Sequence, residues 1–100
     1  MKLTIRSRGV RLTHALDIFV RARVRAALGQ FGRQVRSVVV ALRDAARGRH
    51  PGHRACVIRV EFDRGRSLVV RRRHSDLYAA VALAAARAGM SARLPPPADA

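Results

Sequence analysis

Residues 67–81 read SLVVRRRHSDLYAAV, and within them a strand pattern changes into a helix pattern. Leu68 and Val70 fall on one side of a predicted β-strand that covers 67–73. Ser75 follows as a candidate helix N-cap, and Asp76 falls in the first helical turn, where a carboxylate meets the positive end of the helix dipole. The stretch therefore predicts a strand that leads directly into a helix.

The predicted second helix continues through an alanine-rich segment. Small side chains allow a helix to lie close to a sheet, and the expected buried side consists of Leu77, Tyr78, Val81, Ala84, Ala85 and Ala88. Gly89 is expected to fray the helix, and the prolines at 95–97 end it.

Two more strands are predicted upstream, where apolar residues alternate in 35–43 and again in 56–62. The segment between them, 47–54, is a basic loop that contains Gly and Pro, so the two strands are expected to form a hairpin. At the start of the chain, residues 2–6 alternate as a strand, and Thr13 is a candidate N-cap for a helix that ends near 29–32.

The expected order is therefore β-α-β-β-β-α, an α+β fold in a single domain. One four-stranded sheet with two helices packed on one face is the economical arrangement of these elements. The domain is expected to cover residues 1–94, and residues 95–100 form a short Pro-rich tail.

Charge is the strongest functional signal in the composition. The 100 residues carry 21 Lys+Arg against 6 Asp+Glu, a formal net charge of +15, and Lys2 is the one lysine. Such an excess on a small domain indicates a polyanionic partner. Guanidinium groups bind phosphate in a bidentate manner, which favours nucleic acid over a membrane surface.

Candidate RNA contacts occur first on the predicted first helix. Arg21 and Arg25 are one turn apart, and Arg23 lies at the edge of the apolar stripe, so together they can present a basic ridge to phosphates. The alternative is a solvated helix face in which Asp17 pairs with Arg21.

A second candidate group is the run 71–73. Strand neighbours alternate sides, so Arg71 and Arg73 are predicted to share one face and Arg72 to take the other. The alternative is a solvated strand end. The aromatic residues fall at predicted core positions, so recognition of folded RNA through its backbone is favoured over base stacking.

Several other classes of protein receive little support. The apolar runs fall far short of the roughly 20 residues that span a bilayer, and the first residues lack the pattern of a signal peptide, so a cytoplasmic location is expected. The histidines are scattered, no acid/base pair is evident, and His50 with His53 makes a weak metal motif. Neither enzyme activity nor a cofactor is predicted. Cys56 is expected to be a buried small hydrophobic residue.

The chain resembles the short hibernation-promoting and ribosome-associated inhibitor proteins of bacteria, a group that includes sigma-54 modulation proteins. The likeness covers roughly residues 1–94, and the segments that carry it are KLTI at 2–5, VRLT at 10–13, the valine-rich strand at 35–43 and RHSDLYAAV at 73–81. The last segment is the most specific of them.

This resemblance implies a protein that enters the small ribosomal subunit, blocks access of mRNA and tRNA, and keeps the ribosome idle in stationary phase or stress. It further implies that the partners are the small subunit and its rRNA. No small-molecule substrate is expected, and the isolated chain is expected to be a monomer. RNA contacts are implied for Arg23, Arg73 and Arg87. Ala82 and Ala86 depart from the family pattern and leave the second helix bare. The alternative is a general module that binds structured RNA or modulates a transcription factor.

Overall fold

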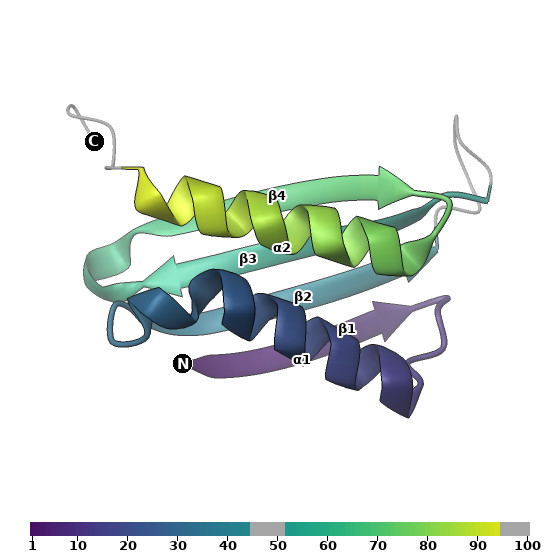
Figure 1. Cartoon of the computed structure of the whole chain (residues 1–100), viewed down its shortest axis with the longest axis horizontal. Coiled ribbons are helices and arrows are strands. Elements are labelled where there is room, and N and C mark those ends of the chain that lie inside the picture. The colour runs from purple at the N-terminus through teal and green to yellow at the C-terminus, as the bar shows by residue number, and fades with distance from the viewer. Residues whose placement is uncertain (45–51, 95–100) are drawn as a thin grey trace.

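The computed structural model describes residues 1–44 and 52–94, and it has the predicted order of elements (Figure 1). The main elements are β1 (Lys2–Arg8), α1 (His14–Leu28), β2 (Val35–Asp44), β3 (Arg54–Phe62), β4 (Ser67–His74) and α2 (Leu77–Arg93). Two single-turn 3₁₀ helices, η1 (Gly29–Phe31) and η2 (Asp63–Gly65), follow α1 and β3. The α+β prediction is confirmed. The tail at 95–100 and most of the predicted loop at 47–54 lie outside the described residues.

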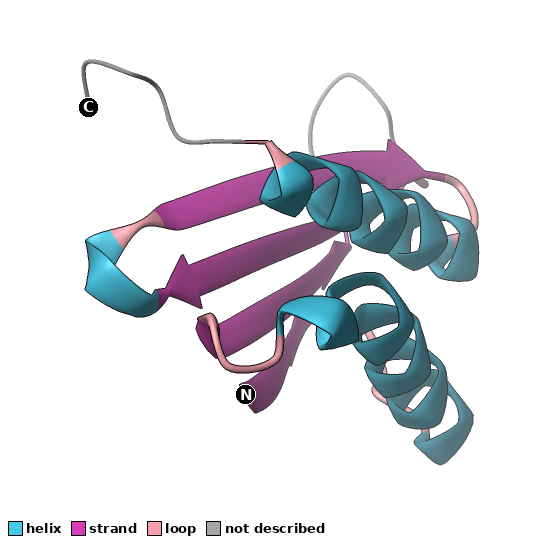
Figure 2. Ribbon diagram, turned by 60° about the vertical axis from the view of Figure 1, so that its left-hand side comes forward, coloured by secondary structure: helices cyan, strands magenta, loops and turns pink. Residues whose placement is uncertain are grey.

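The strands form one mixed sheet in the order β1-β2-β3-β4. β1 pairs with β2 in parallel, and the other two pairings are antiparallel, so β2 and β3 form the predicted hairpin. Both helices lie on the same face of this sheet (Figures 1 and 2). Because α1 follows β1 and α2 follows β4, and these two strands run in the same direction, both helices begin at the same end of the sheet.

The core lies between the sheet and the helices. The side chains of β2 and β3 that point toward the helices are buried, as are the facing residues of α1 and α2. Those with no exposed surface include Val20, Val24, Val38, Val40, Cys56, Ile58, Val60 and Val81. These residues occupy alternate strand positions and every third or fourth helix position, as a two-layer fold requires. No helix within the described ranges is long and apolar enough to cross a membrane.

The two helix starts differ in how well the sequence predicted them. Thr13 caps α1 as expected, since its hydroxyl accepts a hydrogen bond of 3.1 Å from the Leu16 amide. The prediction of Ser75 as the cap of α2 is wrong by one residue. The cap is Asp76, whose carboxylate accepts from the Tyr78 amide at 3.0 Å, while the Asp76 amide itself donates to the His74 imidazole at 2.9 Å. This turn delays the helix until Leu77.

Two expectations for α2 are also wrong. Tyr78 was expected in the core, but it is 40% exposed and sets its ring at 64° to that of Phe19, with the centroids 4.8 Å apart. One position after the buried Leu77, Tyr78 is turned toward the surface beside α1. Gly89 does not fray the helix, which continues to Arg93. It is buried, because the missing side chain lets α2 lie against Ala27 of α1.

Candidate nucleic-acid interface

Of the three predicted arginines on α1, Arg21 is held by its own helix. Its Nε donates a hydrogen bond of 2.7 Å to a carboxylate oxygen of Asp17, one turn earlier, and both side chains are about one-third exposed (35% and 30%). The Asp17–Arg21 ion pair, which the sequence offered as the alternative to RNA binding by Arg21, is therefore formed. This partial neutralisation makes Arg21 a weaker anion site than an arginine without a carboxylate neighbour.

Arg23 lies on the other edge of α1, because two helical residues are about 200° apart around the axis. Its guanidinium carbon is 5.5 Å from the ring centroid of Phe19. It also lines a shallow groove between the two helices, whose α2 side is formed by Ala82, Ala85 and Ala86. The ring contact positions the Arg23 charge beside this groove, apart from Arg21.

Arg25 and Arg87 are exposed, but they do not join Arg23 in a single ridge. Arg87 is about 200° from Ala85 around α2, so it lies on the edge of α2 that faces away from α1. The outer surface of the helices between these arginines includes the exposed apolar side chains Ile18, Leu83 and Met90. The cations of the helical layer are thus scattered over a partly apolar surface.

The predicted separation of the run 71–73 is confirmed by the strand register. Arg71 and Arg73 pair with Val57 and Ala55 on the side of the sheet that the helices leave uncovered. Arg72 is paired with the buried Cys56 on the helix side, and its guanidinium donates to the Arg71 carbonyl at 2.7 Å. The six predicted RNA contacts are therefore divided between two opposite faces of the molecule.

We call the uncovered side of the sheet the open face. Its side chains are Lys2, Thr4, Arg6 and Arg8 of β1, Ser37, Val39, Ala41 and Arg43 of β2, Ala55, Val57, Arg59 and Glu61 of β3, and Ser67, Val69, Arg71 and Arg73 of β4. Within this set of described residues Glu61 is the one acid, and cations come from all four strands. This concentration of positive charge exceeds that on the helices.

Cross-strand pairing arranges the open face in rows. In one row Arg6, Ala41, Val57 and Arg71 lie next to one another across the four strands. The next row toward the end where the helices begin is Arg8, Arg43, Ala55 and Arg73. Each of these rows thus has an arginine at both edges of the sheet, and the inner positions hold small or apolar side chains apart from Arg43.

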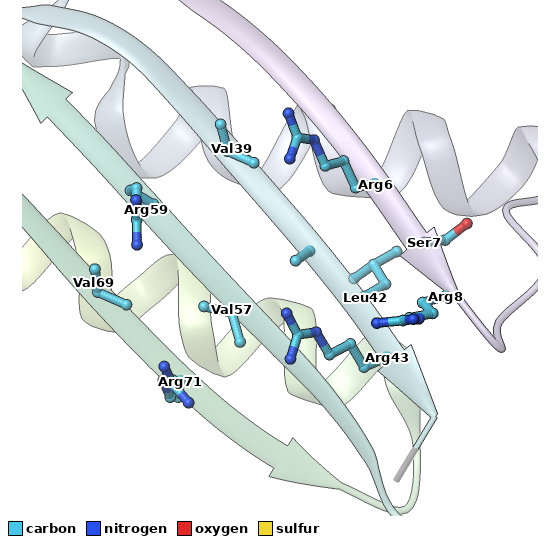
Figure 3. Close-up of a pocket in the computed structure, with 11 residues that line it drawn as sticks. Arg6, Ser7, Arg8, Val39, Leu42, Arg43, Val57, Arg59, Val69 and Arg71 are labelled. Carbon is cyan, nitrogen blue, oxygen red and sulfur yellow. The ribbon is translucent and has the colours of Figure 1, made fainter.

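A hollow of about 520 Å³ lies over these rows. Its floor includes Val39, Val57 and Val69, and Figure 3 shows the side chains of Arg6, Arg43, Arg59 and others arranged around them; the arginines that line it are Arg6, Arg8, Arg43, Arg59 and Arg71. Sequence reasoning identified Arg71 and Arg73 but missed Arg6, Arg8, Arg43 and Arg59. The strand alternation could have identified them, since each of these arginines alternates with core residues along its strand and so points to the other face of the sheet.

The other residues that the sequence raised as chemical candidates are Cys56 and the histidines. Cys56 is fully buried, as predicted, and burial raises the pKa of its thiol to about 12. In the described parts of the chain, no three His, Cys, Asp or Glu side chains gather where they could hold a metal ion. His50, which the sequence pairs with His53 as a weak metal motif, lies outside the described residues.

The fold has close counterparts among solved structures. The N-terminal domain of Thermus thermophilus Protein Y aligns with a TM-score of 0.75 at 21% identity, covering 91% of this chain and 94% of that one. A ribosomal subunit interface protein from Coxiella burnetii aligns with a TM-score of 0.77 at 12% identity, covering 91% and 92%. At these identities the likeness establishes the fold. No curated protein sequence gives a significant match.

The sequence itself carries the family assignment. Residues 3–91 match the model of the family described as sigma 54 modulation protein / S30EA ribosomal protein. The match covers α1, β2, β3 and β4 in full and most of β1 and α2, so it includes nearly all of the segments on which the resemblance was based. The chain therefore belongs to the sigma 54 modulation protein / S30EA ribosomal protein family, a family of ribosome-associated proteins.

Proposed function

We propose that this protein binds the small ribosomal subunit through contacts to the rRNA backbone and blocks access of mRNA and tRNA in stationary phase or stress. The family match over residues 3–91 carries the proposal, because it connects the chain to ribosome association. The proposed action is occupancy of a site and involves no catalysis. It takes place in the cytoplasm, where ribosomes translate, and the free protein is proposed to be a monomer.

The distribution of charge supports a position between RNA elements. Arg23, Arg25 and Arg87 project from the helical layer, whereas Arg71 and Arg73 project from the open face. A domain with cations on two opposite sides can replace counterions on RNA that surrounds it, and each phosphate contact increases the salt dependence of binding. With roughly six to ten contacts, affinity should fall about 10³- to 10⁵-fold between 50 and 200 mM salt.

Co-sedimentation with purified small subunits tests this function. The wild-type chain should migrate with small subunits at physiological salt, and tRNA should compete with it. The double variant Arg23→Glu/Arg87→Glu should bind less strongly while its far-UV circular dichroism is unchanged. A matched control is Arg33→Glu/Arg64→Glu, which changes the charge equally at two exposed residues outside α1, α2 and the four strands.

Two results would count against the proposal. Absence of the wild-type chain from the subunit fractions, even in dilute buffer, would exclude ribosome binding. Equal affinity for any duplex RNA, without preference for subunits, would favour a general RNA-binding module. If the control reduces binding as much as the double variant does, the helix arginines contribute only net charge.

A further inference from the structure

We propose that the open face is a binding site for a single strand of RNA, which it holds by the sugar-phosphate backbone in the hollow between the edges of the sheet. This inference rests on the proposed function, since it specifies the kind of RNA that one face of a ribosome-binding domain would bind. It concerns the open face, which contains Arg73 of the three arginines that the resemblance implies, and not the helices, which carry Arg23 and Arg87.

The first support is uncompensated charge. Within the described ranges the ion pair of the protein is Asp17–Arg21, on the helical layer. The arginines of the hollow therefore have no carboxylate partner there, and Glu61 stands in the row farthest from Arg8 and Arg73. Cations held close together without counterions repel one another, and a polyanion removes this repulsion.

The second support is the shape of the charged region. Neighbouring strands are about 4.8 Å apart, so Arg6 on β1 and Arg71 on β4 are separated by about 14 Å of sheet. Successive rows of the open face are about 6.7 Å apart, two residues along a strand. The hollow of about 520 Å³ between these edges is lined by residues of all four strands, so one strand of nucleic acid that follows a row would contact each of them.

The third support is the chemistry of the floor. Val39 and Val57 are half-buried and Val69 is exposed, so these aliphatic side chains can contact ribose and base faces without specifying a sequence. In the described ranges no aromatic side chain belongs to the open face. The face therefore lacks the aromatic rings on which many single-strand-binding proteins stack bases. Affinity must then come from contacts to phosphate groups, which the planar guanidinium group of arginine binds with two parallel hydrogen bonds.

Direct mapping on the wild-type chain is the first experiment. The probe is a mixed-sequence oligoribonucleotide of about 12 nucleotides, within the range that one small domain binds. In ¹³C methyl spectra, its addition should shift the signals of Val39, Val57 and Val69. The signals of Ala82 and Ala86 on the helical layer should shift less. Larger shifts at the alanines than at the valines would overturn the proposal.

Variants provide the second experiment, with fluorescence anisotropy as the readout. Arg6→Thr/Arg71→Thr removes one cation from each edge of the sheet and keeps a residue suited to strands. It should weaken binding of the oligoribonucleotide about tenfold. The slope of log affinity against log salt should fall by about 1.4, the value for two phosphate contacts on a single strand.

The control Arg33→Thr/Arg64→Thr loses the same charge outside the open face and should change affinity less than about threefold. Equal losses in the two variants would overturn the site. So would equal affinity for polyglutamate, which would make the face a general polyanion surface, or tighter binding of an RNA duplex than of the single strand. Failure of the wild-type chain to sediment with subunits would instead defeat the proposed function and leave these RNA results to be judged separately.

Discussion

The guanidinium of Arg66, just before β4, donates a hydrogen bond of 2.7 Å to the carbonyl oxygen of Leu94, the residue that caps the end of α2. A second contact reaches the Ser91 carbonyl at 3.4 Å, and the guanidinium carbon lies 4.7 Å from the centroid of the Phe62 ring. The last carbonyls of a helix lack partners within it and carry partial negative charge. Arg66 therefore fastens the end of α2 to the connection between β3 and β4.

Replacing Arg66 should destabilise the protein. Arg66→Ala should lower the free energy of unfolding by about 1–2 kcal/mol, because the α2 carbonyls lose a cationic donor and Phe62 loses its stacked partner. Arg66→Lys should retain part of this stability, since it keeps the charge without the planar fork. Urea unfolding followed by circular dichroism measures the effect. A loss no greater than that of Arg33→Ala, an exposed arginine, would contradict this role.

Gly89→Ala should also destabilise the protein, although alanine is the better helix former by about 1 kcal/mol. A β-carbon at position 89 would lie 3.0 Å from the Ala27 carbonyl oxygen and 3.2 Å from the Ala27 side chain. The helices would have to separate, at a cost of about 1–3 kcal/mol. Gly29→Ala is the matched control, since an added carbon there would meet no atom of another segment within 4 Å. Thermal unfolding should show opposite shifts for the two variants, and a stabilised Gly89→Ala would show that the helices can adjust freely.

Asp17→Asn should release Arg21 for RNA binding. The added free cation should increase affinity for a small-subunit rRNA hairpin and steepen the salt slope by up to about 0.9. The same change removes a carboxylate from the first turn of α1, so stability should fall by about 0.5–1 kcal/mol. Asp63→Asn gives the same change in net charge at an exposed residue of η2, the turn between β3 and β4. Identical salt slopes for the two variants would mean that Arg21 does not reach the RNA.

The thiol of Cys56 should be chemically silent in the folded protein. Burial raises its pKa to about 12, so the reactive thiolate is scarce at neutral pH. Iodoacetamide should modify Cys56 in denaturant but not in the native state, as mass spectrometry can measure. Rapid modification of the native protein would contradict the burial.

The same pKa shift predicts a loss of stability in alkali. An unfolded thiol ionises near its ordinary pKa of about 8.5, whereas the folded one retains its proton. The contribution of Cys56 is therefore complete below about pH 8.5 and is lost as the pH rises toward about 12. Unfolding free energies measured across this range should fall less steeply for Cys56→Ala than for wild type. Parallel curves would show that other groups cause the alkaline loss.

Local patterns were sufficient for the order of elements. Alternation in 35–43 and 56–62 predicted β2 and β3, and Thr13 marked the start of α1, because these signals depend on residues within a few positions of one another. Two errors in α2, its first residue and the role of Gly89, arose from contacts that the periodic pattern of apolar residues does not include. His74 accepts the Asp76 amide and moves the start of α2, and the approach of Ala27 gives Gly89 a packing role.

The sequence by itself determined a basic α+β domain, its strand phases and the family to which it belongs, because periodicity, charge and motif are properties of the chain alone. Only the tertiary structure decided which cations share a surface. Arg6, Arg43, Arg59 and Arg71 come from four different strands, and the pairing register brings them together around one hollow. Arg23 and Arg71 are placed on opposite faces because both helices pack on the same side of the sheet. Such placement follows from contacts between segments distant in sequence, which no local pattern contains.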